Sequence, residues 1–209
     1  MVTPILILAP LIVVSISLIL FLISKPSITA GPGGKILAFI ALFILPVLVG
    51  FVGISEHLER SKRTEFCLSC HIMTDYGRSL YVDDKEYVAA SHFQNNRIPR
   101  DKACFTCHTD YTMFGDFKAK LRGLRHLYVQ YIGTIPDTLK LYTPYNNREC
   151  LHCHEGGRTF EESRYHSQNA TMLVSMKSNA ISCLTSGCHD VIHNVHGLND
   201  AEFWKGASQ

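Results

Sequence analysis

The sequence predicts a mostly α-helical protein with long loops, in which N-terminal transmembrane helices precede a compact domain built around cofactors. Two observations carry this prediction. The first 55 of the 209 residues are nearly free of charge and contain two long apolar runs. The remainder is polar and rich in loops, and it holds all eight cysteines, arranged in pairs. We therefore expect a membrane anchor over residues 1–55 and a second domain over residues 56–209.

The two apolar runs cover residues 4–24 and 36–54. Each is long enough to cross a hydrocarbon core of about 30 Å at about 1.5 Å per residue. A cleaved signal peptide is the alternative for the first run. However, that run exceeds the usual apolar region of roughly 7–15 residues, and no basic residue precedes it. We expect both runs to be transmembrane helices.

The cysteine pairs share one feature, which is that a histidine directly follows the second cysteine of each pair. Three pairs match Cys-x-x-Cys-His, the attachment motif of c-type haem. The two thiols of such a motif reach the two vinyl groups of one porphyrin, and the histidine then lies beneath the iron. The fourth pair encloses four residues, and Gly187 would help this longer loop to bulge. We number these motifs I to IV: Cys67, Cys70 and His71; Cys104, Cys107 and His108; Cys150, Cys153 and His154; Cys183, Cys188 and His189.

Four covalently attached haem c groups explain this pattern better than other cysteine chemistry does. A zinc site would need four ligands from two pairs, and it would leave the histidine after each pair unexplained. A domain of about 150 residues with few aliphatic runs also has little side-chain core of its own. We therefore expect a compact multihaem cytochrome c domain whose core is the haems. The net charge of only +2 gives no reason to expect a nucleic-acid partner.

Four six-coordinate irons need eight axial ligands, and the motif histidines supply four of them. We expect His92, His166 and one of His193 or His196 to be distal ligands, with His92 and His166 on haems other than those of their nearest motifs. Methionine also ligates haem iron, and Met73 lies just after motif I. His57, His126 and His152 fit less well, because they lie in charged helical stretches or between attached cysteines. The candidate iron ligands are His71, Met73, His92, His108, His154, His166, His189, His193 and His196. Irons with all positions filled transfer electrons and bind no substrate.

One helix is well marked between motifs II and III, because apolar residues recur every three or four positions from Phe114 to Tyr131. We expect this apolar stripe to be buried. The other face carries Lys118, Lys120, Arg122 and Arg125. That basic face is either solvated or in contact with haem propionates or anionic lipid headgroups.

The topology follows from where haem is attached. The loop of residues 25–35 has a lysine at each end, which favours a cytoplasmic position, although basic residues also follow the second helix. Attachment of c-type haem takes place outside the cytoplasmic membrane. We therefore expect a bacterial cytoplasmic membrane protein with its haem domain on the periplasmic face and both termini outside.

Residues 64–73, which include motif I and Met73, resemble the first haem segment of the NapC/NirT/NrfH family of tetrahaem quinol dehydrogenases. Ser91-His92 is similar to that family's distal histidine segment, and residues 146–154 are similar to its third motif segment. The resemblance covers roughly residues 56–198.

The resemblance implies a cytochrome that oxidises membrane quinol, menaquinol or ubiquinol, at haem I and supplies a periplasmic redox protein or reductase. It also implies that Met73 competes with His71 for the iron of haem I. A lysine near the quinol in relatives corresponds approximately to Lys118 and Lys120. His57, just after the second apolar run, is a candidate base for a quinol proton.

The chain departs from the family in having two predicted helices rather than one and a longer fourth motif. The extra helix indicates either packing against another integral membrane subunit or a differently built quinone pocket. The alternative function is therefore an electron-relay haem subunit of a larger complex in which another subunit handles quinone. A small reductase acting on its own substrate would need an iron with an open position. The supply of candidate ligands is large enough to fill the iron positions, which argues against this function.

Overall fold

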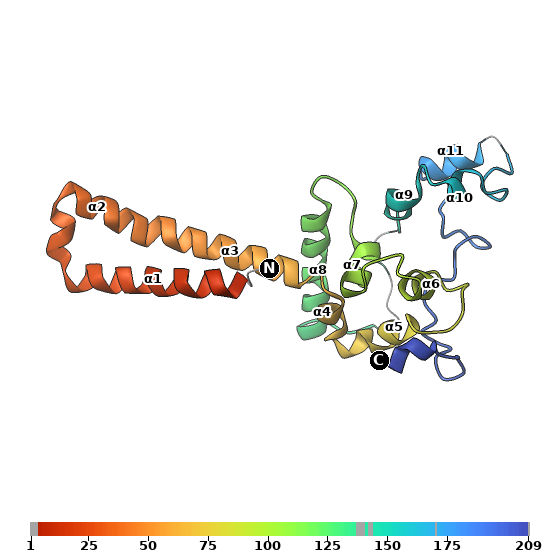
Figure 1. The fold of residues 1–209 in the computed structure, drawn as a ribbon, viewed down its shortest axis with the longest axis horizontal. Helices are drawn as coiled ribbons and strands as arrows, with labels where there is room; N and C mark the ends of the chain where they lie inside the picture. The colour runs from red at the N-terminus through yellow and green to blue at the C-terminus, as the bar shows by residue number, and fades with distance from the viewer. Residues whose placement is uncertain (1–3, 137–140, 142–143, 170, 209) are drawn as a thin grey trace. The chain divides into compact units, whose positions relative to one another are not determined.

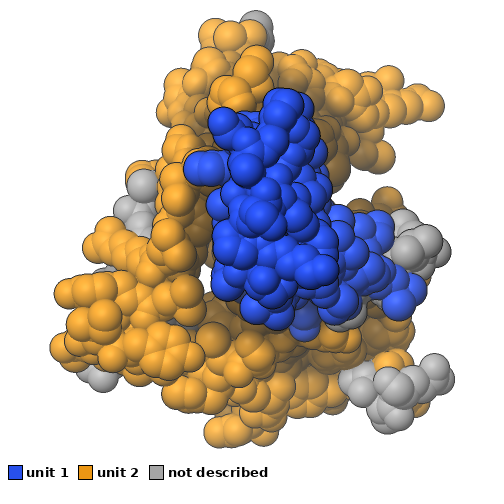
Figure 2. All heavy atoms as spheres, turned by 90° about the vertical axis from the view of Figure 1, so that its left-hand side faces the viewer, with its two compact units in different colours: residues 1–61 blue, residues 62–209 orange. Residues whose placement is uncertain are grey.

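The computed structural model describes residues 4–136, 141, 144–169 and 171–208. The chain forms two compact units, residues 1–61 and residues 62–209, which Figure 2 distinguishes by colour. Helices and loops make up the described residues, and the only extended pairing among them is a single bridge between Val82 and Phe203. This confirms the prediction of a mostly α-helical chain with long loops.

The first unit consists of two apolar helical runs (Figure 1). The first is α1 (Pro4–Ser24), which is followed by the 3-10 turn η1 (Pro26–Ala30). The second run is continuous through α2 (Pro32–Phe39), the π-helical segment η2 (Ile40–Ile44) and α3 (Leu45–Arg60). Both runs are long and apolar enough to cross a membrane. The prediction of two N-terminal apolar helices is confirmed.

The second run is longer than its apolar part, because it begins at Pro32 and continues through polar residues to Arg60. Proline is favoured in the first turn of a helix, and the basic side chains in the last turn complement the helix dipole. Pro46 explains the π-helical segment. Because proline has no N–H, the register changes just before it, where Leu45 N–H donates to the Ile40 carbonyl.

The buried residues described in the first unit are Ser15, Leu22, Ala41 and Ser61, whereas most of its large apolar side chains, such as Phe51, are exposed. Small residues let helix backbones approach closely without a hydrophobic driving force. The outer surface of this unit is therefore apolar, as a lipid environment requires.

The second unit is assembled from short helices and loops. In chain order they are α4 (Thr64–Leu68), η3 (His71–Met73), α5 (Thr74–Ser79), α6 (Val88–Gln94), η4 (Arg100–Lys102), α7 (Ala103–His108), α8 (Gly115–Tyr131), α9 (Arg148–His154), α10 (Arg158–Glu161), α11 (Met172–Lys177) and η5 (Lys205–Ser208). The side-chain core of the described residues is divided into two small clusters. One is centred on Leu80 and Phe93, and the other on Leu151, Phe160 and Met176. Such small clusters agree with a domain whose interior is completed by cofactors.

The expectation of a buried apolar stripe on α8 is wrong. Phe117, Leu121 and Leu124 are each more than half exposed. Ala119 and Gly123, on the opposite face of the helix, are half-buried instead.

Candidate haem-binding site

Short helices present the attachment cysteines of the first three motifs. Helices α7 and α9 each contain a whole motif, so that their two cysteines, three residues apart, lie on one face. In motif I, α4 ends just after Cys67 and η3 begins at His71.

Motif IV forms a compact loop rather than a helix. His189 N–H donates to the Cys183 carbonyl over 3.0 Å, which closes the loop. Gly187 has φ +82°, a left-handed conformation that glycine adopts readily and other residues rarely adopt. The two extra residues of this motif are thus accommodated with the cysteines at the two ends of one tight loop.

The first cysteines of motifs I and II are in contact, and so are those of motifs III and IV. A hydrogen bond with the Cys104 thiol lowers the pKa of Cys67 to about 7, and one with Cys150 lowers the pKa of Cys183 to about 7. Burial raises the pKa of Cys107, with a smaller contribution from the charge of the nearby Cys153. The thiols therefore connect motif I to motif II, motif II to motif III, and motif III to motif IV.

Two buried polar side chains connect neighbouring motifs, one between motifs I and II and the other between motifs III and IV. Thr64 Oγ1 donates to the Arg100 carbonyl and accepts from Ala103 N–H, both over 2.8 Å, which connects motif I to the start of motif II. Asn147 plays the same part for motifs III and IV. Its Nδ2 donates to the carbonyls of Met176 (2.8 Å) and Ile181 (2.6 Å), and its Oδ1 accepts from Cys183 N–H (2.8 Å). Each residue stands three positions before the first cysteine of its motif.

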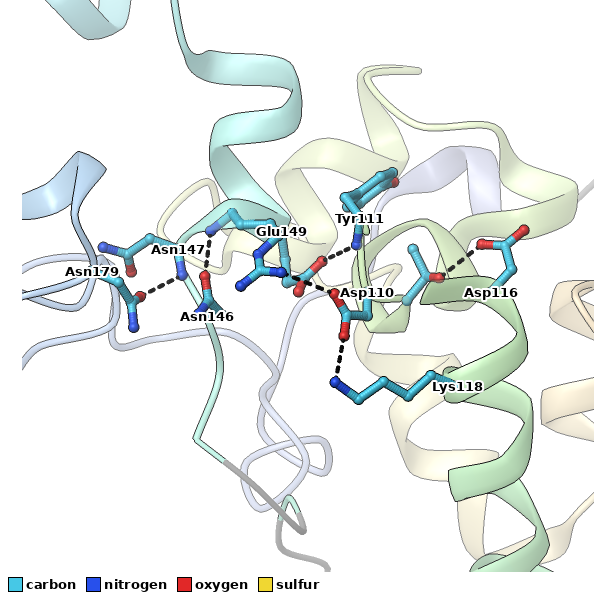
Figure 3. Close-up of polar contacts among 10 residues, drawn as sticks. Asp110, Tyr111, Asp116, Lys118, Asn146, Asn147, Glu149 and Asn179 are labelled. Atoms are coloured by element: carbon cyan, nitrogen blue, oxygen red, sulfur yellow. Dashed lines mark hydrogen bonds and ion pairs between the residues drawn. The ribbon is translucent and has the colours of Figure 1, made fainter. Parts of the chain in front are cut away.

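The segment after motif II connects α8 to α9 (Figure 3). The Asp110 carboxylate is paired with Lys118 Nζ at 3.2 Å and with Arg148 Nη1 at 3.4 Å. Tyr111 N–H donates to the Glu149 carboxylate over 3.2 Å. A side chain at Gly115 would collide with the Asp110 carbonyl oxygen, so a glycine is needed where α8 begins. These contacts hold motif II, α8 and motif III in one arrangement.

Three histidines outside the motifs are oriented as metal ligands are. His92 Nδ1 donates to the Val88 carbonyl over 2.8 Å, and His166 Nδ1 donates to the Phe160 carbonyl over 3.0 Å. Because a carbonyl only accepts, Nδ1 carries the hydrogen, and Nε2 of the neutral ring keeps its lone pair for a metal. His193 Nδ1 lies 2.9 Å from Ser79 Oγ, whose own hydrogen goes to the Tyr76 carbonyl. Ser79 Oγ therefore accepts a hydrogen bond from His193 Nδ1, and Nε2 of His193 keeps its lone pair for a metal as well.

The spacing of the imidazole rings fits axial coordination of haem iron. The ring centres of His92 and His154 are 5.9 Å apart, and those of His166 and His189 are 6.3 Å apart. Metal–imidazole bonds are about 2 Å long, so two rings on opposite sides of one metal have centres about 6 Å apart. Burial, with a smaller contribution from the charge of His108, lowers the pKa of His193 to about 4, so His193 is neutral at pH 7. Neutral imidazole is the form that binds metal.

The remaining predicted residues lie in three different helical elements, η3, α8 and α3. His71 and Met73 share the turn η3 at motif I. Lys120 Nζ lies 4.4 Å from the ring centre of Phe105 in motif II, and its charge contributes to lowering the pKa of Cys67. His57 belongs to the last turn of α3, in the first unit.

Two other histidines differ from the distal candidates in their surroundings. The ring of His152 stacks on Tyr111, with ring centres 3.7 Å apart. His196 is exposed. Neither shows the backbone-anchored orientation of His92 and His166.

Sequence reasoning missed Thr64, Ser79 and Asn147, because their roles depend on partners that are distant in the chain. For Thr64 and Asn147 a signal was present, since both are short polar residues at the same position before a motif.

Comparison with known proteins identifies the family of this chain. The sequence model of the NapC/NirT cytochrome c family, N-terminal region, matches residues 33–198. The cytochrome c-type protein NapC of Haemophilus influenzae is 26% identical over 172 residues, which cover 74% of this chain and 79% of that protein. The cytochrome c-type protein TorC of Escherichia coli is 30% identical over 177 residues, covering 77% of this chain but only 40% of TorC.

The denitrification system component NirT of Stutzerimonas stutzeri is 26% identical over 153 residues, which cover 65% of this chain and 69% of that protein. No solved structure matches the chain. The family match extends over more than half of the chain and confirms the resemblance of the motif segments. The chain belongs to the NapC/NirT cytochrome c family, and it is a membrane-anchored multihaem cytochrome c with covalently bound haem that acts in electron transfer.

Proposed function

We propose that this chain carries four haems, takes electrons from membrane quinol, menaquinol or ubiquinol, and passes them to a periplasmic redox protein or reductase. The observation that carries the proposal is the unbroken series of contacts from motif I to motif IV. Cys67 meets Cys104, Cys107 lies near Cys153, and Cys150 meets Cys183. Such a series suits transport of electrons across the domain.

The residues that would hold three of the irons are His92 with His154, His166 with His189, and His193 with His108. When bound, the haem irons supply one-electron redox chemistry. The chain's own part is to hold each imidazole in the tautomer that offers Nε2, through the hydrogen bonds at Nδ1. His71 and Met73 remain for motif I, and His196 is left outside the ligand set.

The haem domain is proposed to lie on the periplasmic face of the cytoplasmic membrane, with both termini outside. An even number of membrane crossings brings the two ends of the anchor to the same side, and haem attachment takes place outside the cytoplasm. The membrane anchor is proposed to comprise residues 1–55 and the haem domain residues 56–209, although helix α3 itself continues to Arg60.

Quinol is proposed to bind near motif I, where Lys120 lies beside Cys67. Oxidation of a quinol releases protons as well as electrons, so a base and a route to water are needed. Lys118 and Lys120 offer ammonium groups to the quinol oxygens, and His57 is the candidate base. Lys118 is held in place by its ion pair with Asp110.

Replacing Lys118 or Lys120 with glutamine, or His57 with alanine, is expected to slow reduction by a reduced quinol analogue. The loss should be on the order of 100-fold for the group that takes the proton, whereas reduction by dithionite should be unchanged. Stopped-flow absorbance of the full-length protein in nanodiscs measures both rates. Lys177→Gln, which alters a surface lysine paired with Glu161, is the control. If every variant keeps the parent rate with quinol, electrons enter elsewhere and the relay-subunit function takes precedence.

Intact-mass analysis of the purified protein is expected to show four haem additions. The fourth depends on the lengthened motif IV, whose loop holds Cys183 and Cys188 at its two ends. The same spectrum should show a chain that retains both apolar runs. A mass corresponding to three haems would contradict the prediction that motif IV carries a haem.

The alternative function, a relay subunit in a larger complex, is supported by the exposed apolar side chains of α1 and α3. A second integral membrane subunit would cover part of that surface. Quinol oxidation by the isolated protein distinguishes the two functions, because a relay subunit alone would not be reduced by quinol.

A further inference from the structure

Helix α8 presents a continuous apolar face to the outside of its unit. This outer face consists of Phe117, Leu121, Leu124 and Tyr128, whose exposed fractions are 57%, 51%, 58% and 59%. Phe114 and Tyr131 extend it at the two ends of the helix, with exposed fractions of 73% and 80%. Burial of so much apolar surface is strongly favourable, so its exposure indicates a partner.

The rest of the unit packs on the opposite side of this helix. Ala119 and Gly123 are half-buried, and at about 100° per residue Leu121 lies about 180° from the midpoint between them. Lys120, over the Phe105 ring in motif II, is also half-buried. The attachment residues therefore lie behind the helix rather than in front of its outer face.

Basic side chains border the outer face along one edge. Lys118, Arg122 and Arg125 follow one another there at intervals of three or four residues. The one acidic residue of α8, Asp116, is bound by Lys62 at 2.8 Å. An apolar face with aromatic residues and a basic edge is typical of helices that lie in the membrane interface.

We propose that α8 lies in the membrane interface as a second point of attachment, with its outer face buried at the boundary between headgroups and acyl chains. Its basic edge then meets anionic headgroups, to which it is complementary in charge. The bilayer is always within reach, because the chain is anchored in it. The proposal does not depend on the use of quinol.

Photo-crosslinking from the outer face tests this proposal. Benzoylphenylalanine is introduced at Phe117 or Tyr128 of the full-length haem protein, in nanodiscs of phosphatidylglycerol. Tyr165, an aromatic residue with 62% exposure elsewhere in the second unit, is the matched control. Mass spectrometry should find lipid adducts from positions 117 and 128 and few from position 165. A cross-linked dimer would indicate a second copy of the chain as the partner, and equal yields at all three positions would indicate solvent; either result overturns the proposal.

The basic edge provides an independent test. Each basic residue near an anionic surface is worth about a fivefold change in the binding equilibrium, so Arg122→Gln and Arg125→Gln should each lower the ratio of inserted to free helix by about that factor. The lipid-adduct yield should fall accordingly in phosphatidylglycerol and much less in phosphatidylcholine. Arg158→Gln, which removes a charge paired with Glu162 on another helix, should leave the yield unchanged. A double Arg122→Gln/Arg125→Gln variant that retains its haem and keeps the parent yield in phosphatidylglycerol would overturn the proposal.

Discussion

Replacing Asn147 with alanine is expected to destabilise the part of the domain that holds motifs III and IV and to lower its haem content. The Asn147 side chain is almost fully buried and satisfies the carbonyls of Met176 and Ile181 and the N–H of Cys183. Each buried group left without a partner costs about 1–3 kcal/mol. The total, about 3 kcal/mol or more, is a large share of the stability of an ordinary domain.

Thermal unfolding followed by haem absorbance, together with mapping of haem-bearing peptides, measures this effect. Asn146→Ala is the matched control, because that side chain accepts one exposed hydrogen bond, from Arg148 N–H. Thr64→Val removes two hydrogen bonds between motifs I and II, so its smaller effect should be confined to the first two haems. Equal melting temperatures and haem contents for Asn147→Ala and Asn146→Ala would contradict the prediction.

Replacing His92 with alanine is expected to convert one iron from low spin to high spin without loss of haem. The thioether bonds are made by other residues, so the intact mass should change only by the substitution. The iron above His154 would lose the imidazole whose ring centre lies 5.9 Å from that of His154. His166→Ala should have the same effect on the iron above His189. Electron paramagnetic resonance of the oxidised protein reports the spin state directly.

The two histidines after motif IV provide an internal comparison. His193→Ala should produce a high-spin iron, because His193 is oriented by Ser79 and lies near His108. His196→Ala should leave every iron low spin. A low-spin spectrum unchanged by His92→Ala would mean that another residue coordinates that iron.

The parts of the site that are local in sequence were predictable, and those that depend on distant partners were not. The attachment motifs were read directly, because two cysteines and a histidine at a fixed spacing describe one chemical unit. His92 and His166 were selected by the supply of ligands, but nothing in the sequence indicates that the ring of His92 meets His154 rather than His108. That choice is made by contacts such as those of Asp110, which join segments almost forty residues apart.

Helix α8 shows a different limit of sequence reasoning. Its periodicity identified an amphipathic helix correctly, and burial of the apolar side was the natural expectation for a soluble domain. Periodicity does not tell which side faces inward, however. Here the face that bears Ala119 and Gly123 is half-buried, whereas Leu121 and Leu124 are exposed.

The equivalent positions of Thr64 and Asn147 have a consequence for the order in which the chain folds. The hydrogen bond from Ala103 to Thr64 closes a loop of 39 residues, and that from Cys183 to Asn147 closes a loop of 36 residues. Short loops close at a low entropic cost, so each half of the domain is expected to form without the other. The contact of Ser79 with His193 spans 114 residues and joins the first half to the end of the chain. We therefore expect the two halves to form first and the C-terminal tail to join them last.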